Sequence, residues 1–420
     1  MMASTCAART LEGPDPNRPS PGSKSAGIVS ASGMRTAYWR PQWHHCPVLR
    51  IDAGVQRYNW GAIDGIPQLL GIEPDGGPFA EAWWGAHPAA PSATAAGDLA
   101  QVIAADPVAA LGMDVAQEWG QLPYLLKVLS IAKPVSIQVH PTRDQAHVIN
   151  EAYGPAESPL ADHEHKPEMV VALTPMRLQS GFRPVRETAA DLRLLNHPVA
   201  LHLADVIESP DGISAYMAQA LEADASSGVL EALTAARDAT AGSDVLRAAA
   251  DAADAHPGDM GALVSLALNV VELAPGQACF TGAGVVHTYH SGLGLEIMAA
   301  SDNVLRAGLT TKPVHVPLVL DIAHLMPSDP LLPAPIGDGE ARTFIAPASE
   351  FQLSLVADGQ GTWAGGPRIV LALDGTAVVV AGGGTVVLER GQAVFVSDSD
   401  GPMSVDANGM ASVASVPTLA

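Results

Sequence analysis

Polar side chains alternate with aliphatic ones over residues 136–141. Ser136, Gln138 and His140 are separated by Ile137 and Val139. Successive side chains of a β-strand point to opposite faces, so the three polar side chains would project together. An amide oxygen and an imidazole at this spacing could contact one metal ion. The same pattern is typical of a half-buried strand whose polar face meets solvent, and the segment alone leaves both interpretations open.

Two further segments carry groups of the same chemical kind. Residues 163–169 read HEHKPEM, in which Glu168 is a candidate metal ligand and Lys166 would share its face if the segment is extended. Residues 282–289 read GAGVVHTY and offer His287. Alone, the first segment could be a solvated polar loop and the second a core histidine beside a glycine turn. The two glycines do not complete a GxGxxG pattern, which excludes a dinucleotide-binding loop.

Together the segments supply two imidazoles, one carboxylate and one amide, from His140, His287, Glu168 and Gln138. Nitrogen and oxygen ligands of this kind suit Zn²⁺ and leave a position for water or substrate. No cysteine lies in these segments, which argues against a closed structural zinc site.

Residues 294–312, GLEIMAASDNVLRAGLTTK, add paired acidic and basic groups. A polar strand edge and turn would account for this segment alone. A phosphate group, however, needs cations in an otherwise acidic protein, and Arg306, Lys312 and the earlier Lys127 can supply them. The chain has only five lysines, and four of them fall in the segments that we single out.

Composition narrows the class of protein. The 420 residues are 48% hydrophobic and 16% charged, a globular balance, and the formal net charge of −22 argues against a nucleic-acid partner. The chain has no apolar run of the roughly 18 residues that would span a bilayer, and no signal-peptide pattern. Its three cysteines are too few for a disulfide framework. We therefore expect a soluble, cytoplasmic protein that does not associate with membranes and acts as a monomer.

Residues 1–46 carry Pro, Ser and Gly clusters and are predicted to be a disordered leader. Short strand-like runs follow, and residues 123–130 and 135–140 are predicted to be two adjacent strands. Residues 185–265 are rich in Ala, Leu and Asp at helical spacing, which predicts a helical insertion. An internal echo, GQACF at 276–280 and GQAVF at 391–395, suggests a duplicated barrel whose second copy lacks the histidine.

The longest motifs resemble those of type I phosphomannose isomerases. They are YNWG (58–61), AEAWWGAHP (80–88), LPYLLKVLSIAKPVSIQVHP (122–141), HKPEM (165–169), GFRP (181–184) and the long block from His256 to Lys312. The resemblance runs in order from about Val55 to Lys312 and is looser beyond. Residues 313–317, PVHVP, depart from the family pattern without touching a proposed ligand, and the helical insertion matches poorly.

The resemblance implies a mainly β fold with an α-helical insertion and two cupin-like (jelly-roll) β-barrels. The catalytic barrel would comprise residues 47–184 with 266–325. The helical domain would be 185–265, and 326–420 would form a metal-free C-terminal barrel.

Functional residues follow from the resemblance position by position. It implies one zinc ion on Gln138, His140, Glu168 and His287, the set that ligand chemistry also suggests. The catalytic group would be Arg306, Lys166 and Glu296, and the substrate-binding group would be Lys127, Ser136, Tyr289, Asp302 and Lys312.

The activity implied is an aldose–ketose isomerisation of mannose 6-phosphate and fructose 6-phosphate through a cis-enediol. Lys166 or Glu296 would carry the proton and Arg306 would offset the negative charge of the enediolate, while the sequence leaves the base at C2 undecided. Two other classes stay open. One is an Fe²⁺-dependent cupin oxygenase on His140, His287 and Glu168, and the other is a non-catalytic cupin that binds sugar phosphates.

Overall fold

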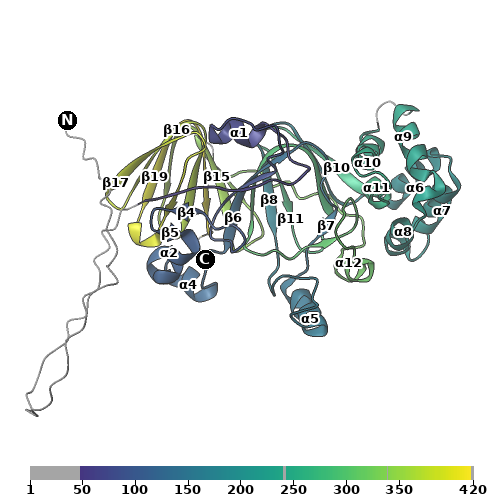
Figure 1. Ribbon diagram of the computed structural model, residues 1–420, viewed down its shortest axis with the longest axis horizontal. Helices are drawn as coiled ribbons and strands as arrows, with labels where there is room; N and C mark the ends of the chain where they lie inside the picture. Colours follow the sequence, from purple (N-terminus) through teal and green to yellow (C-terminus); the bar gives the residue numbers. More distant parts are fainter. Residues whose placement is uncertain (1–47, 240–242, 338, 418–420) are drawn as a thin grey trace, which may run out of the picture. The chain divides into compact units, whose positions relative to one another are not determined.

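Strands dominate the described part of the chain, and they form two large antiparallel sheets. The structure is a computed structural model that describes residues 48–239, 243–337 and 339–417 (Figure 1). The predicted leader over residues 1–46 lies outside the described residues. Among the described residues no helix combines the length and the apolar character needed to cross a membrane.

The first sheet carries the segments singled out above. Its main path runs β10-β9-β12-β6-β3-β2, while β11, β8, β7 and β13 pair beside that path. These strands are β2 (Gly54–Gln56), β3 (Glu81–Trp84), β6 (Tyr124–Ile131), β7 (Gln138–Val139), β8 (Glu168–Ala172), β9 (Met176–Phe182), β10 (Leu268–Leu273), β11 (Ala278–Thr281), β12 (His287–Ala299) and β13 (Leu305–Arg306). The long strand β12 pairs with β6, β7, β8 and β9 and so connects most of the sheet.

The second sheet has the order β1-β18-β16-β19-β15-β14, with β17 paired to β16. Its strands are β1 (Leu49–Ile51), β14 (Ala341–Ile345), β15 (Gln352–Trp363), β16 (Arg368–Ala381), β17 (Gly384–Glu389), β18 (Ala393–Val396) and β19 (Met403–Ser415). Short strands β4 (Ala93–Thr94) and β5 (Gly97–Asp98) form a separate pair. Among the described residues, the pairing of neither sheet returns to its first strand.

Five strands of the first sheet repeat in the second in the same order. The order β11-β8-β12-β6-β3 corresponds to β18-β16-β19-β15-β14. The register repeats too: Glu168 lies opposite Thr281 and Met298, and Arg368 lies opposite Val396 and Ser415. The position of Glu168 in the first sheet is therefore taken by an arginine in the second.

The echoed GQA sequences occupy equivalent turns, which is the physical basis of the internal repeat. Gly276 and Gly391 have φ values of 82° and 81°, a conformation that favours glycine. Their N–H groups donate to Ala172 and Ala372 O, respectively, at 2.8 Å in both turns. In each turn the following glutamine caps the end of the preceding strand through its side-chain oxygen.

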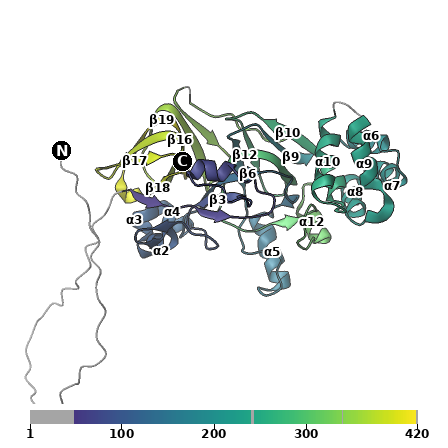
Figure 2. The same ribbon diagram turned by 45° about the horizontal axis from the view of Figure 1, so that its top comes forward.

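Helices occupy the segment between β9 and β10, which is the Ala-rich stretch predicted to be helical. They are α6 (Val185–Leu194), α7 (Pro198–Ile207), α8 (Gly212–Leu221), α9 (Val229–Ala239), α10 (Asp244–Ala255) and α11 (Gly261–Leu266), with the 3-10 turn η1 (Ala225–Ser227). They gather beside β9 and β10 in both ribbon views (Figures 1 and 2). Four alanines on α10 are fully buried, so the helices can approach one another closely; they are Ala248, Ala249, Ala250 and Ala252.

Helices also interrupt the N-terminal stretch that strand-like runs had been expected to fill. They are α1 (Gly65–Leu70), α2 (Leu99–Ala105), α3 (Pro107–Leu111), α4 (Met113–Glu118) and α5 (Arg143–Tyr153), and α12 (Val316–Ile322) and the 3-10 turn η2 (Asp398–Asp400) lie further along the chain. Helix α5 begins with a capping box in which the Thr142 side chain accepts from Gln145 N and the Gln145 side chain accepts from Thr142 N.

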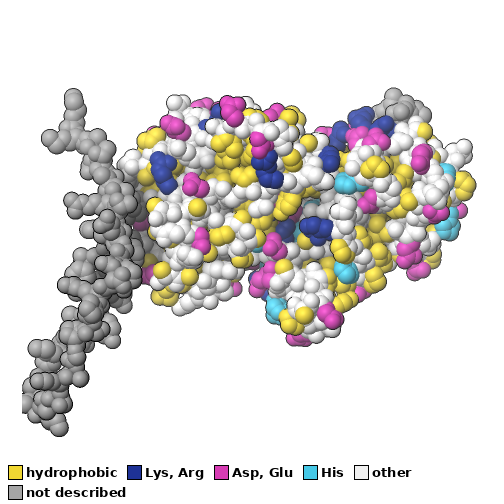
Figure 3. Space-filling view, in the orientation of Figure 1, with side chains coloured by type: hydrophobic (Ala, Val, Ile, Leu, Met, Phe, Trp, Pro, Cys, Tyr) yellow, Lys and Arg dark blue, Asp and Glu magenta, His cyan; other side chains and the backbone are white. Residues whose placement is uncertain are grey.

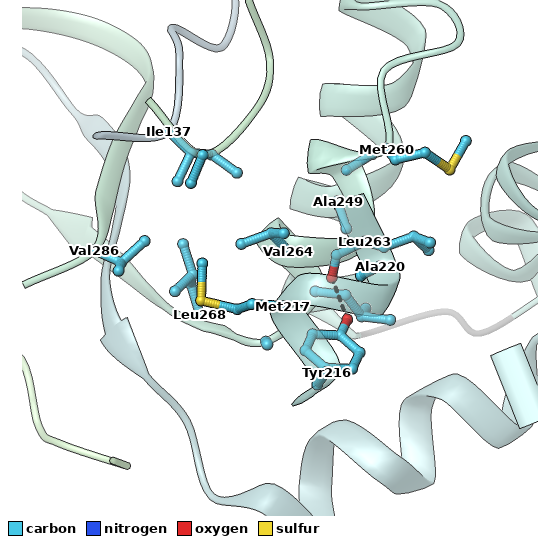
Figure 4. Close-up of a cluster of buried hydrophobic side chains, with 14 of the residues drawn as sticks. Ile137, Tyr216, Met217, Ala220, Ala249, Met260, Leu263, Val264, Leu268 and Val286 are labelled. Atoms are coloured by element: carbon cyan, nitrogen blue, oxygen red, sulfur yellow. Dashed lines mark hydrogen bonds between the residues drawn. The ribbon is translucent and has the colours of Figure 1, made fainter. Parts of the chain in front are cut away.

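The helical segment shares one hydrophobic core with the strands that carry the site. Figure 4 shows Ile137 and Val286, which flank predicted ligands in sequence, facing Val264 and Leu268. In the same core the Tyr216 hydroxyl donates to Leu263 O. The helices therefore support the back of β7 and of the turn before β12.

One sequence prediction about strands is wrong. Residues 123–130 and 135–140 do not form adjacent strands, because β6 pairs with β3 and β12, while β7 pairs with β12 and β13. Strand β1 falls in the range assigned to the catalytic barrel, yet it pairs with β18 of the second sheet. Local alternation finds strands but does not identify their partners, because pairing is decided by non-local burial.

Tyr124 of β6 connects the two sheets and gives a test of their packing. Its buried hydroxyl lies 3.0 Å from both Pro367 O and Ala414 O. Tyr124→Phe should lower the free energy of unfolding by about 1–3 kcal/mol, because buried carbonyls lose their donor. Urea titration followed by tryptophan fluorescence would measure it, with the exposed Tyr153→Phe as the control that should change nothing. Equal urea midpoints for Tyr124→Phe and Tyr153→Phe would show that the Tyr124 hydroxyl does not stabilise the packing of the two sheets.

Candidate active site

Three predicted metal ligands lie close together and buried, on or directly after strands of the first sheet. His140 follows β7, Glu168 begins β8 and His287 begins β12. Glu168 Oε1 lies 2.8 Å from His287 Nε2, and Glu168 Oε2 lies 3.3 Å from His140 Nε2. All three residues are buried, and one potential ligand atom from each lies within 4.8 Å of the others.

Backbone carbonyls set the orientation of both imidazoles. His140 Nδ1 lies 2.7 Å from Asn303 O, and His287 Nδ1 lies 3.0 Å from Val285 O. A carbonyl oxygen can only accept, so each Nδ1 carries a hydrogen and each Nε2 is turned toward Glu168.

This arrangement fits a metal ion. Ring nitrogens and carboxylate oxygens face one another at contact distance, and the buried His140 Nε2 has no hydrogen-bond partner. A lone pair buried without a partner beside a carboxylate is unfavourable unless a cation lies between the atoms. Two imidazoles and a carboxylate are the ligands of an open zinc site. These three residues therefore fit the zinc ion that the sequence predicts.

Burial and charge act together on the ionisable groups of this cluster. Burial, reinforced by the charge of Lys166, lowers the pKa of His140 to about 4. Burial alone would raise the pKa of Glu168, but the charge of Lys166, together with the neighbouring His140 and His287, outweighs it and holds that pKa well below its usual value. The carboxylate is thus ionised and the His140 ring is neutral at physiological pH.

Lys166 and Tyr289 complete the surroundings of Glu168. Lys166 Nζ donates to Glu168 Oε2 at 2.7 Å, as expected for side chains two positions apart on an extended segment. The Tyr289 hydroxyl donates to Glu168 Oε1 at 3.2 Å. Burial, with the charges of Glu168 and Glu296, raises the pKa of Tyr289 well above its usual value, so its hydroxyl stays protonated.

A second buried cluster lies on β3, β6 and β12. Lys127 is the only charged residue of β6, a strand that is buried along its whole length. It lies opposite Glu296 in register, with Nζ 3.3 Å from Glu296 Oε2 and 3.7 Å from Glu81 Oε2. Burial raises the pKa of Glu296 against the opposing charge of Lys127. The Lys127 ammonium also lies 4.8 Å from the ring centre of Trp83.

Both clusters open into one cavity of about 860 Å³. The predicted site residues that line it are Gln138, Glu168, His287, Lys166, Glu296, Arg306, Lys127, Ser136, Tyr289, Asp302 and Lys312. His140 is fully buried and does not line it. The structure therefore brings together every residue that the sequence singled out, with His140 one layer behind the cavity wall.

Gln138 lies in the middle of this wall. In register it is opposite both His287 and Arg306, and its side-chain amide donates to Ser136 Oγ at 3.2 Å. Burial and like-charge repulsion lower the pKa values of two cations nearby. Burial lowers the pKa of Arg306, and the charge of Arg306 lowers the pKa of Lys312.

Acidic side chains are spread over the face shown in Figure 3, where Lys and Arg gather at only a few places. The cations of the cavity are therefore exceptional in a chain of net charge −22. An anionic ligand that bound between Arg306 and Lys312 would relieve their mutual repulsion.

Several residues of the site were not predicted from the sequence. Glu81 and Trp83 lie within a motif that carried the family resemblance but were given no role, although both contact Lys127. His87, from the same motif, is buried with Nε2 3.3 Å from Asp302 Oδ2. Asn303 was also missed, and no local sequence signal distinguishes its carbonyl as a partner of His140.

The pKa of His140 predicts how acid affects the metal-free protein. Between pH 6.5, the ordinary value, and about 4, the unfolded chain binds a proton that folded His140 does not. Stability should therefore fall on acidification across this window, by at most about 3 kcal/mol from this residue. Urea unfolding of chelator-treated protein between pH 7.5 and 4.5 measures it.

His140→Gln should flatten that pH dependence, whereas His202→Gln, at an exposed position, should keep it. An unchanged slope in His140→Gln would show that this histidine does not titrate between the two states as described.

Known proteins of similar sequence place the chain in a family. Residues 48–185 match the family model for the catalytic domain of phosphomannose isomerase type I. Mannose-6-phosphate isomerase of Escherichia coli K12 is 36% identical over 384 residues, which cover 86% of this chain and 97% of that protein. The human mannose-6-phosphate isomerase is 30% identical over 67% of this chain and 74% of its own length.

Solved structures agree with the sequence matches. A crystal structure of a mutant phosphomannose isomerase from Salmonella typhimurium matches with a TM-score of 0.81 and 31% identity, covering 88% of this chain and 99% of that one. A mannose 6-phosphate isomerase crystallised with zinc and yttrium matches with a TM-score of 0.80. From sequence, fold and site together, the chain belongs to the type I phosphomannose isomerase family.

Proposed function

We propose that this chain is an isomerase that interconverts mannose 6-phosphate and fructose 6-phosphate. The observation that carries the proposal is the pair of buried clusters at one cavity: two imidazoles with a carboxylate, and Lys127 beside Glu296. Family membership supports the same reaction, because the relatives named above are mannose-6-phosphate isomerases.

One zinc ion per chain is the cofactor that we infer. His140, Glu168 and His287 would hold it, with Gln138 as the fourth ligand because it neighbours His287 in register. A related mannose 6-phosphate isomerase was crystallised with zinc, which supports the choice of metal. When bound, zinc would supply Lewis-acid polarisation of a substrate oxygen and lower the cost of negative charge there.

Cations at the cavity wall would bind the anionic parts of the substrate. We assign Arg306 to the enediolate, because it lies opposite Gln138 in register and is thus close to the proposed ligands. Lys312 and Ser136 line the same cavity and would contact the phosphate, while Asp302 is placed to accept from a sugar hydroxyl. Because the exterior is acidic, a phosphate dianion should bind at the cations Arg306 and Lys312 of the cavity wall.

The proton between C1 and C2 needs a group that can both accept and donate. Glu296 suits this role, since its pKa is raised by burial and its contact with Lys127 holds one carboxylate oxygen in place. Lys166 donates to Glu168, so in this geometry its ammonium serves as a hydrogen-bond donor that fixes a proposed ligand. Tyr289 holds the other oxygen of the same carboxylate.

The finer architecture also stays a proposal. The repeated strand order and the equivalent turns support two cupin-like barrels that arose by duplication. Arg368, at the position equivalent to Glu168, would repel a cation and supports a metal-free second barrel. The division into catalytic, helical and C-terminal domains, a monomeric state and a cytoplasmic location remain predictions.

A coupled assay of mannose 6-phosphate conversion to fructose 6-phosphate tests the reaction and the metal together. Activity should be lost after chelation and return when zinc is restored, because the proposed ligands would then lack the Lewis acid that polarises the substrate. A folded, zinc-loaded protein with no activity would sink the isomerase proposal and favour a sugar-phosphate-binding protein. Oxygen consumption with Fe²⁺ would favour the oxygenase instead.

Glu296→Gln should lower kcat by about 10²–10⁴-fold, the usual contribution of a positioned acid–base group, and leave zinc content unchanged. Glu81→Gln is the matched control, since it also contacts Lys127 but at the longer distance of 3.7 Å, and it should lose far less. Lys166→Met should instead lower zinc content as well as activity. If Glu296→Gln keeps near-normal turnover and only Lys166→Met loses kcat, the proton carrier is Lys166 instead.

A further inference from the structure

Asn303 is a fully buried asparagine between two loops of the site. Its backbone carbonyl is the acceptor for His140 Nδ1 at 2.7 Å. Its side chain faces the opposite way, toward the 161–164 loop, which leads directly to Lys166 and Glu168. A single residue thus contacts one proposed ligand and the loop that carries another.

The side-chain amide of Asn303 is saturated with hydrogen bonds. Its Oδ1 accepts from Ala161 N at 2.8 Å and from Asp162 N at 3.0 Å. Its Nδ2 lies 2.8 Å from Asp162 O, 2.9 Å from Asp162 Oδ1 and 2.7 Å from Glu164 O. Only an amide offers donors and an acceptor in this arrangement, so neither Asp nor Leu of similar size could replace it.

Asp162 in turn hydrogen-bonds to the loop that contains Asn303. Its carboxylate accepts from Ser301 Oγ at 2.9 and 3.1 Å and from Asp302 N at 3.1 Å. Ser301 Oγ in turn accepts from Asn303 N at 3.2 Å. The 161–164 and 301–303 loops are therefore joined by a closed set of hydrogen bonds that holds the Asn303 carbonyl in one place.

We propose that Asn303 is a positioning residue that fixes the tautomer of His140 and the relative placement of His140 and Glu168. The carbonyl keeps hydrogen on Nδ1, which leaves Nε2 as the free ligand atom, and the amide locks the loop that ends at Glu168. Partners of this kind usually affect metal affinity by about 10–100-fold. The inference rests on the proposed metal site, but its first test needs no metal.

The first test is ¹H–¹⁵N NMR of the histidine rings in metal-free protein, with the His140 signal assigned by its loss in His140→Gln. Wild type should show His140 with hydrogen on Nδ1. Asn303→Asp should lose that single tautomer, because a carboxylate oxygen would face three oxygen acceptors and displace the loop. A wild-type ring with hydrogen on Nε2, or an Asn303→Asp ring that keeps hydrogen on Nδ1, would overturn the proposal.

The second test is zinc affinity by chelator competition. Asn303→Asp should bind zinc about 10–100-fold more weakly. The matched control is Asn269→Asp, which also removes three amide contacts, to Ser180 O, Gly181 O and Ser328 O, none of them in a ligand or its loop. The control should lower thermal stability yet keep wild-type affinity. Equal zinc affinities for the two variants would show that Asn303 is merely structural.

Ser301→Ala is the milder variant for the case in which Asn303→Asp does not fold. It removes the hydroxyl that links Asp162 to Asn303 N and leaves the amide intact. Zinc should bind it several-fold more weakly, with the His140 tautomer partly lost. Unchanged affinity and tautomer in Ser301→Ala would contradict the proposal. If wild type binds zinc through the Nδ1-protonated ring but does not turn over, the proposed reaction fails while this inference stands.

Discussion

An ionised carboxylate buried against two imidazoles is the constraint on which the rest of the site depends. Glu168 is charged because the Lys166 ammonium, together with the neighbouring histidines, outweighs the cost of its burial. Each ring turns Nε2 toward the carboxylate because a carbonyl oxygen occupies its Nδ1. Removing water from such a set is costly unless charge is compensated. A cation at the centre would satisfy all three groups at once and would compensate for their burial.

The strands deliver these groups because their register places them opposite one another. Glu296 and Lys127 are cross-strand neighbours on β12 and β6, and Gln138 lies between His287 and Arg306. A one-residue slip in either pairing would turn these side chains to the other face of the sheet. The hydrophobic core shared with the helical segment opposes such a slip, since it packs against Ile137 and Val286 beside the ligands.

Much of the site could be predicted from the sequence, because its residues lie in short motifs of chemically distinctive types. Alternation placed Lys166 with Glu168, and ligand chemistry selected the histidines. The adjacency of β6 and β7 was predicted wrongly, and the pairing of β1 with β18 was not foreseen, because strand partners depend on contacts distant in sequence. Asn303 was missed for a similar reason: its role comes from a backbone carbonyl, which every residue possesses.

The repeated strand order places charges of opposite sign at one equivalent position of the two sheets. Arg368 occupies the position of Glu168 and is equally buried, yet its guanidinium donates to Ser397 O and Gly401 O. Those carbonyls belong to the turn between β18 and β19, which corresponds to the turn before His287 in the first sheet. Backbone carbonyls stabilise the positive charge in the second sheet, and that charge would repel a metal ion, whereas the carboxylate in the first sheet could bind one.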